Sequence, residues 1–349
     1  MSIRHADAAW LNRELTRWLH RRRHPLTATF ELCWRCNFRC IHCYLRGQPE
    51  PEALELGEVC ALLDELAQAG CLALSLTGGE PLVREDFDAI LRAAVQRGFL
   101  VSVFTNASLV DAARAARWAA TPPRMIEVSL YGASPASYEL ITGSAAAFER
   151  TLAGIDRLLE QGLVVSLKAM LQRDLAAEVD AMRALAAERG LGLRIDPGLD
   201  PTLDGDPAPT ELRIPAAQAA RIELADPERV ERMRAYHARW QAADASLRES
   251  PCGAGYHSFH LDPAGRLMPC LLLREPALDT RSLGFAQAWR ELGRCARPAF
   301  APGSACAGCM LQHLCSHCPG LARLGCGPDD EGQPYYHCEL AQHRASVLG

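Results

Sequence analysis

The chain has 349 residues, a hydrophobic fraction of 49% and a formal net charge of −5. This length allows one large domain with a smaller one beside it, and the weak negative charge gives no sign of a general nucleic-acid-binding protein. Because the sequence holds no apolar run of about eighteen residues and no apolar signal core near its start, we expect a cytoplasmic protein without a membrane span.

Residues 1–25 carry six arginines, five of them around Trp10, Leu11, Leu15 and Trp18, which recur near helical spacing. This pattern predicts a basic, amphipathic helix on the surface.

Residues 26–205 alternate short apolar runs with longer helical patterns. The predicted elements are a strand at 26–32, a helix at 58–69, a strand at 72–77, a helix at 87–96, a strand at 100–105, a helix at 111–119, a strand at 126–130, a helix at 147–160, a strand at 164–171, a helix at 176–188 and a strand at 193–195. Such alternation predicts parallel strands with right-handed crossovers. Six units fit an α/β fold with an open, partial (β/α)6 barrel, whose ligands are expected at the carboxyl ends of the strands.

Residues 206–250 are expected to form a linker and a bridging helix, because prolines and glycines cluster before about residue 215 and a helical pattern follows over 216–248. In residues 251–349 the periodicity fades and cysteines become dense. That composition predicts a small C-terminal cysteine-rich domain held together by metal centres. Fifteen cysteines in a chain of this length favour metal binding over disulfides, which are typical of short secreted scaffolds.

Cys36, Cys40 and Cys43 follow the first predicted strand with gaps of three and two residues. Three thiolates on one tight loop can hold three irons of a cubane cluster and leave the fourth iron open. A cluster with four protein thiolates mainly transfers electrons, whereas an open metal position can also bind and activate a ligand. The loop therefore indicates an enzyme.

The second predicted strand ends in Gly78, Gly79, Glu80 and Pro81, on the same edge of the barrel as the cysteine loop. Glycines allow the backbone to approach a ligand closely, and the carboxylate can accept hydrogen bonds from an ammonium group. With the CxxxCxxC loop, this segment resembles the radical S-adenosylmethionine (SAM) superfamily over about residues 26–200. Further matching positions are Thr105 and Asn106 at the end of the third strand, Ser129 at the end of the fourth, and His42, which replaces the family's usual aromatic residue and can pack against adenine.

The resemblance implies a definite chemistry. The open iron of a [4Fe–4S] cluster would bind the amino and carboxylate groups of SAM, and an electron from the reduced cluster would break a carbon–sulfur bond. The resulting 5′-deoxyadenosyl radical would remove a hydrogen atom from the substrate, while the protein orients the reactants and excludes water. A flavodoxin or ferredoxin is the expected electron donor.

The C-terminal cysteines resemble a SPASM domain, the extension that carries auxiliary iron–sulfur clusters in peptide-modifying relatives. By this resemblance one auxiliary [4Fe–4S] cluster has four cysteine ligands, which are Cys306, Cys309, Cys315 and Cys338. A second cluster would have the three ligands Cys252, Cys270 and Cys318, with a fourth position that is open or is filled by His257, His260 or substrate. Three clusters are therefore expected in all. Structural zinc is the alternative, since paired CxxC elements are also zinc spacings.

Three further residues are weaker candidates. Cys326, in a glycine-rich segment, could donate a hydrogen atom or serve as a spare ligand. Lys168 is the single lysine among 37 basic residues, and strand alternation places it on the face opposite Leu167. Lys168 and Arg194 could each pair with a carboxylate of SAM or substrate, or could be ordinary surface residues.

The expected substrate is a ribosomally synthesised peptide, modified by oxidation, crosslinking or epimerisation. About 25 residues precede the first strand, too few for a peptide-binding winged helix, so a separate leader-peptide-binding protein is expected as a partner. A sugar, a tetrapyrrole or another small metabolite is the alternative substrate. A catalytically inactive binding protein that keeps its clusters is the third interpretation.

Overall fold

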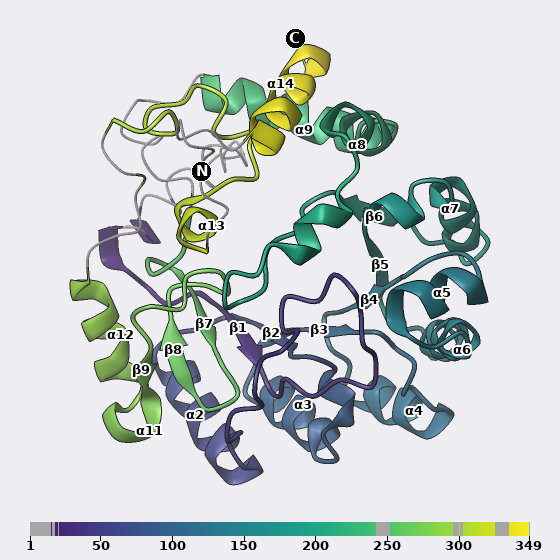
Figure 1. The fold of residues 1–349 in the computed structure, drawn as a ribbon. Coiled ribbons are helices and arrows are strands. Elements are labelled where there is room, and N and C mark those ends of the chain that lie inside the picture. The colour runs from purple at the N-terminus through teal and green to yellow at the C-terminus, as the bar shows by residue number, and fades with distance from the viewer. Residues whose placement is uncertain are drawn as a thin grey trace, which may run out of the picture.

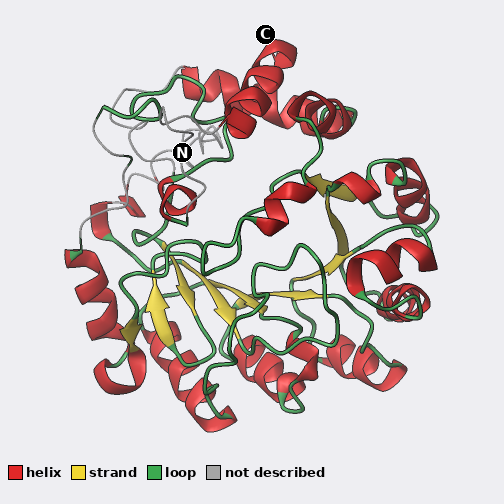
Figure 2. Ribbon diagram, viewed as in Figure 1, coloured by secondary structure: helices red, strands yellow, loops and turns green. Residues whose placement is uncertain are grey.

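A nine-stranded sheet forms the frame of the protein, in the order β6-β5-β4-β3-β2-β1-β7-β8-β9 (Figures 1 and 2). The structure is a computed structural model that describes Leu15 and residues 18–19, 21–241, 252–295, 300, 303–324 and 335–348. The strands are β1 (Thr27–Glu31), β2 (Ala73–Thr77), β3 (Leu100–Thr105), β4 (Met125–Ser129), β5 (Val165–Met170), β6 (Leu193–Asp196), β7 (Ser258–Leu261), β8 (Arg266–Met268) and β9 (Leu278–Asp279). Strands β1 to β6 are parallel to their neighbours, as in the expected partial barrel.

Helices follow the parallel strands and cover the outer side of the curved sheet (Figure 1). They are α2 (Leu56–Gln68), η1 (Pro81–Val83), α3 (Phe87–Gln96), α4 (Ala112–Ala120), α5 (Pro135–Thr142), α6 (Ala147–Glu160), η2 (Arg173–Leu175) and α7 (Val179–Ala187). The later helices are η3 (Ala208–Leu212), α8 (Ala216–Glu223), α9 (Pro227–Gln241), α11 (Thr280–Leu283), α12 (Phe285–Arg294), α13 (Pro319–Arg323) and α14 (Tyr335–Leu348). No helix in the part of the chain that the structure describes is long and apolar enough to cross a bilayer.

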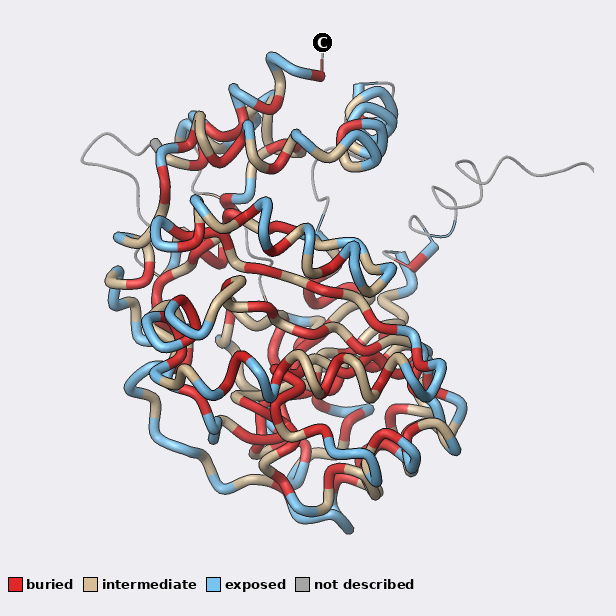
Figure 3. The backbone as a smooth tube through the Cα atoms, turned by 90° about the vertical axis from the view of Figure 1, so that its right-hand side faces the viewer, coloured by how far each residue is buried: buried red, intermediate tan, exposed pale blue. Residues whose placement is uncertain are grey.

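Alternation along the strands separates two faces of the sheet. In β5 the odd positions Val165, Leu167 and Ala169 are buried, whereas Ser166 and Lys168 are only partly buried. Val165 and Leu167 pack in the large apolar core under the outer helices, and Ala169 packs in a smaller neighbouring cluster. Figure 3 shows how buried and less buried positions are distributed along the chain. The partly buried set faces the interior of the barrel, so the site is built from these side chains and from the loops at the carboxyl ends of the strands.

Three features of the fold were not predicted. The first is a short helix, α5, which is capped by Ser134, whose hydroxyl accepts from the Ser137 backbone, and by Gly143, which has a left-handed φ of 76°. The expected bridging helix is two helices, since Pro227 cannot continue α8 and instead begins α9.

The third unexpected feature is that β7 pairs in parallel with β1, so residues beyond 251 extend the barrel sheet itself. Strands β8 and β9 then continue it as antiparallel neighbours. Most of the predicted N-terminal helix lies outside the described residues. Of its described positions, Leu19 is buried and Trp18 is 47% exposed, so Trp18 does not pack into the core.

Candidate active site

The three cysteines of the CxxxCxxC loop lie together at the carboxyl end of β1. They are close enough for their charges to interact when they ionise. A thiolate at Cys36 would raise the pKa of Cys40, and a thiolate at Cys43 would raise the pKa of both Cys36 and Cys40. Loss of solvation raises the pKa of all three thiols, and this mutual repulsion raises the pKa of Cys40 further. The metal-free loop therefore holds protonated thiols at neutral pH, and metal binding there must release protons.

Hydrogen bonds fix this loop to the neighbouring strands. Asn37, between the first two cysteines, donates to Ser108 Oγ over 2.8 Å and accepts from Asn106 Nδ2 over 2.9 Å. Asn106 Oδ1 in turn accepts from both the backbone and the hydroxyl of Ser108. On the other side, the backbone of Arg39 donates to the carbonyl of Thr142 at the end of α5. Sequence reasoning did not identify Asn37 or Ser108, which hold the loop on the barrel.

Gly78 and Gly79 allow the cysteine loop to cross directly over the end of β2. A Cβ on Gly78 would lie 2.2 Å from the carbonyl oxygen of Cys33, and one on Gly79 would lie 2.3 Å from that of Trp34. Gly78 also has a φ of 155°, which other residues rarely adopt. The close neighbour that these glycines admit is therefore the protein's own backbone, and the Gly79 and Glu80 amides donate to the Cys33 and Arg35 carbonyls.

Glu80 is 1% exposed and joins the ends of β2 and β3. Its Oε1 accepts from Thr105 Oγ1 over 2.7 Å and from the Leu82 amide over 3.1 Å, and its Oε2 accepts from the Asn106 amide over 2.7 Å. Both oxygens are thus occupied by protein donors, so in this structure the predicted cofactor residues Glu80, Thr105 and Asn106 also hold the site together. Pro81 begins η1 directly after Glu80.

Burial raises the pKa of Glu80 to about 7, although its hydrogen bonds act in the opposite direction. A carboxyl group that holds its proton more tightly when folded loses stability as the pH rises through its folded pKa. In the metal-free chain, the unfolding free energy of the wild type relative to Glu80→Gln should therefore fall by up to about 3 kcal/mol between pH 4.5 and pH 8. Denaturant unfolding at several pH values measures this difference. Glu52→Gln, in the exposed loop before α2, is the control, and a difference that is independent of pH would contradict the prediction.

Aromatic side chains lie beside the cysteine loop at the end of β4. The rings of His42 and Tyr131 are 6.0 Å apart, and Tyr131 also contacts Phe38 and forms hydrogen bonds with Cys40 and Ser129. Burial lowers the pKa of His42 to about 4, so its imidazole is neutral. His42 Nδ1 is buried and has no hydrogen-bond partner among the described residues. A neutral ring with an unpartnered polar atom fits contact with an adenine, and Tyr131 is a site residue that sequence reasoning missed.

Lys168 and Arg194 both lie near the barrel interior but differ in their surroundings. Lys168 is opposite Ser129 in the β4–β5 register, and its Nζ lies 3.6 Å from Asp196 Oδ2. Arg194, with a side chain that is 50% exposed, donates to Glu127 over 2.9 Å. Each cation thus has a carboxylate partner within the chain, and Lys168 is the nearer of the two to the predicted SAM contact Ser129.

The C-terminal cysteines form two groups. Cys252, Cys270 and Cys318 act on one another electrostatically, and a separate set formed by Cys306, Cys309, Cys315 and Cys338 does the same. The structure therefore brings together the same residues that the SPASM resemblance assigns to each auxiliary cluster. All fourteen cysteines among the described residues are unbridged.

The surroundings of these thiols suit iron–sulfur clusters. Backbone amides point at Sγ atoms in each group: Phe38 N to Cys36, Leu273 N to Cys270 and His317 N to Cys315, at 3.3–3.4 Å. Such hydrogen bonds to sulfur tune clusters in proteins. Groups of thiols that accept such hydrogen bonds fit iron–sulfur clusters, whose usual protein ligands are cysteine thiolates.

The remaining candidates fall in different places. His257 contacts Gly253 next to Cys252, which keeps it beside the three-cysteine group. His260 is buried, and its Nε2 lies 3.1 Å from Glu31 Oε2, so that nitrogen is directed at the barrel. Cys326 lies outside the described residues.

A buried charge cluster around Glu31 connects the first cysteine loop with the C-terminal region. Its two oxygens accept from Tyr44 over 2.8 Å, Trp34 over 2.8 Å and Arg274 over 2.9 Å. Burial alone would raise the pKa of Glu31, but His260 and Arg274 lower it to about 2. The sequence signal for this cluster was a carboxylate at the end of an otherwise apolar strand, next to a cysteine loop that contains Trp34 and Tyr44.

Glu31→Gln should lower the free energy of unfolding by about 3–5 kcal/mol, because it leaves the mostly buried Arg274 without its charged partner. Guanidinium unfolding of the anaerobic holoprotein would measure this loss. Asp64→Asn is the matched control, since Asp64 is itself 54% exposed, unlike the buried Glu31, and its pair with Arg97 should contribute less than about 1 kcal/mol. Equal, small losses in both variants would show that the Glu31 cluster is not stabilising.

Comparisons with known proteins agree with this geometry. The model of the Radical SAM superfamily matches residues 32–183. The mycofactocin maturase MftC of Mycobacterium ulcerans is 29% identical over 346 residues, covering 92% of this chain and 91% of its own length. The AdoMet-dependent heme synthase of Methanosarcina barkeri is 26% identical over 337 residues, covering 89% of this chain and 96% of its own.

Among solved structures, SuiB of Streptococcus suis with bound S-adenosylmethionine superposes with a TM-score of 0.66 at 15% identity, over 89% of this chain and 78% of SuiB. SuiB bound to the precursor peptide SuiA gives a TM-score of 0.59 at 16% identity, over 75% of this chain and 64% of SuiB. These similarities extend the shared fold well beyond the barrel into the cysteine-rich region. The chain belongs to the radical SAM superfamily and is a radical SAM enzyme.

Proposed function

We propose that this enzyme modifies a ribosomally synthesised peptide, using one catalytic cluster and two auxiliary clusters, three [4Fe–4S] centres in all. The catalytic cluster is held by Cys36, Cys40 and Cys43. The auxiliary clusters are held by Cys252, Cys270 and Cys318 and by Cys306, Cys309, Cys315 and Cys338. The observation that carries this proposal is the gathering of cysteines into three separate groups, one on the barrel and two in the C-terminal region.

When bound, the catalytic cluster and SAM supply a radical that can remove a hydrogen atom from an unactivated carbon. The contribution of the chain is position and exclusion of water. The crossing at Gly78 and Gly79 and the Asn37 hydrogen bonds hold the cysteine loop rigidly, and His42 and Tyr131 offer rings beside it. The auxiliary clusters held by the C-terminal cysteines would supply an electron acceptor. Net oxidation would then remove from the substrate one hydrogen atom to the radical, one electron to a cluster and one proton to water or a base.

Peptide modification is supported by the similarity to the maturase MftC over nearly the whole of both chains. The test is anaerobic incubation of the reconstituted enzyme with SAM, dithionite or flavodoxin, and each short peptide encoded beside its gene. We expect stoichiometric 5′-deoxyadenosine and a peptide lighter by two hydrogens, detected by mass spectrometry. Formation of 5′-deoxyadenosine with every such peptide unchanged would argue against a peptide substrate.

A tetrapyrrole is the second candidate, because the heme synthase relative is matched over 96% of its own length. Incubation with an iron coproporphyrin under the same conditions separates the two candidates. Conversion of the porphyrin, with unchanged peptides, would reassign the substrate while leaving the radical chemistry as it is.

A further inference from the structure

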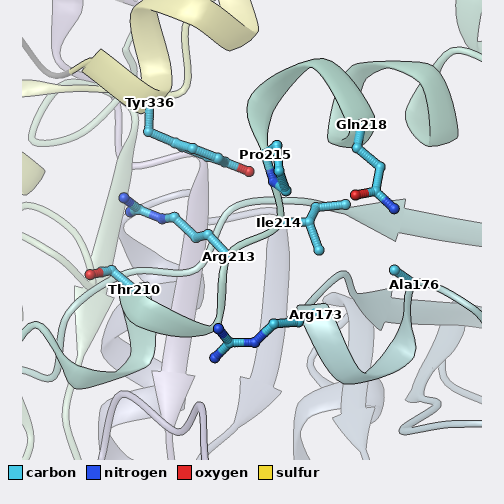
Figure 4. Close-up of a pocket in the computed structure, with 8 residues that line it drawn as sticks. All are labelled: Arg173, Ala176, Thr210, Arg213, Ile214, Pro215, Gln218 and Tyr336. Carbon is cyan, nitrogen blue, oxygen red and sulfur yellow. The ribbon is translucent and has the colours of Figure 1, made fainter.

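A cavity of about 710 Å³ lies at the carboxyl edge of the barrel, and no cysteine is among its lining residues (Figure 4). Its wall is formed by Arg173 in η2 after β5, Arg213 at the end of η3, Gln218 in α8 and Tyr336 in the first turn of α14. It therefore lies where the barrel meets the last helix of the chain. The mechanism above uses none of these residues.

The lining of this cavity is positively charged. The lining contains two guanidinium groups and no carboxylate. Neither Arg173 nor Arg213 forms an ion pair with any residue that the structure describes. Arg213 is held in place by donating from Nε to the carbonyl of Leu199 over 3.0 Å and by stacking 4.8 Å from the centre of the Tyr336 ring. Arg173 is exposed, so it can turn toward a ligand.

A second, independent feature is the hydroxyl of Tyr336. This oxygen is buried, it has no hydrogen-bond partner among the described residues, and it is directed toward Pro215 in the cavity wall (Figure 4). A buried hydroxyl without a partner is unfavourable, and an acceptor on a ligand that reached it would relieve this cost. Two guanidinium groups and a phenol are the donors that a planar carboxylate binds best.

The cavity is also linked electrostatically to the ends of β5 and β6. Arg213 interacts electrostatically with Asp200. Asp200 also interacts electrostatically with Lys168 and Asp196, at the ends of β5 and β6. Asp200 acts on Cys318 of the three-cysteine group as well. A ligand group in the cavity would thus be at the margin of the barrel opening, with the rest of the ligand free to reach inward.

We infer that the pocket formed by Arg173, Arg213 and Tyr336 binds a carboxylate of the substrate and so positions the residue to be modified. This inference rests on the proposed function and adds to it that the peptide is acidic near its reacting residue. The carboxylate belongs either to an acidic side chain or to the C-terminus of the peptide.

Modification of arginines by p-hydroxyphenylglyoxal, read by mass spectrometry on the anaerobic holoprotein, tests this inference. Three synthetic probes share the sequence acetyl-Gly-Ala-X-Tyr-Gly-Ala. The first has X as Glu and an amidated end, the second has X as Gln and a free carboxylate, and the third has X as Gln and an amidated end. We expect one or both of the first two to protect Arg173, and the third to leave it reactive. Which probe protects identifies the source of the carboxylate.

Arg92, exposed on α3, is the internal control and should be labelled equally with every probe. Arg173→Gln should weaken binding of the protecting probe about tenfold, whereas Arg92→Gln should not change it. Tyr336→Phe gives a second variant that keeps the ring and removes only the hydroxyl, and it should weaken binding as well. Equal protection by the neutral probe, or none by either carboxylate probe, would overturn the inference.

Labelling is measured without turnover, so the two proposals can fail separately. Protection of Arg173 by a carboxylate probe in an enzyme that modifies no peptide would refute the proposed substrate and leave the pocket assignment standing. Modification of a peptide, with no protection of Arg173 by either carboxylate probe, would support the proposed substrate and refute the pocket assignment.

Discussion

Replacing Cys36, Cys40 and Cys43 together by alanine should remove about four of about twelve irons per chain and abolish formation of 5′-deoxyadenosine. The three thiols lie close enough to act on one another, and they are the cysteines grouped on the barrel. The two C-terminal groups belong to other segments and should keep their iron. Iron and sulfide analysis after anaerobic reconstitution, with chromatography of the nucleoside products, measures both effects.

Cys60→Ala is the matched control for this experiment. Cys60 is a partly buried thiol on the outer helix α2, and its loss should change neither the iron content nor SAM cleavage. A wild type with about four irons plus zinc would contradict the auxiliary clusters. Residual SAM cleavage in the triple variant would contradict the assignment of the catalytic loop.

Gly79→Ala should prevent assembly of the catalytic cluster although it adds only one methyl group. That carbon would lie 2.3 Å from the carbonyl oxygen of Trp34 and 2.5 Å from that of Arg35, and both atoms are backbone and cannot turn aside. The cysteine loop must then move off β2, breaking the hydrogen bonds from the Gly79 and Glu80 amides. We expect about four irons fewer per chain, no SAM cleavage, and a loss of several kcal/mol in unfolding free energy.

Gly57→Ala provides the control, because no atom lies within 4 Å of the position its Cβ would take. Gly57 is within α2, where alanine should stabilise the helix by up to about 1 kcal/mol. If Gly79→Ala reconstituted normally and cleaved SAM at the wild-type rate, the loop would not depend on this crossing.

The barrel was predictable because its signals are local. Each parallel strand is a short apolar run followed by a helical pattern, and the predicted boundaries of β2 to β6 lie within one residue of those in the structure. The membership of the two C-terminal cysteine groups came from the resemblance to SPASM domains, and the structure brings the same residues together.

What could not be predicted depends on residues far apart in the chain. The carboxylate of Glu31 accepts from Arg274, more than two hundred positions later, and no spacing rule connects the two. Strand β7 is only four residues long, and its pairing with β1 is set by contacts rather than by its own pattern. The packing of Gly78 needed the structure for a related reason: the sequence shows that the backbone comes close to something there, but only the structure shows that the protein atom beside it is the carbonyl oxygen of Cys33.

The pairing of β1 with both β2 and β7 has a consequence for synthesis on the ribosome. Strand β2 emerges soon after β1, but β7 begins about 230 residues later. Until then one edge of β1 has free amides and carbonyls, and such an edge invites pairing with another chain. A fragment that ends near residue 250 keeps that edge permanently, so expression of the barrel alone should give a chain prone to aggregation, and the C-terminal region acts as the strand that closes the nascent sheet.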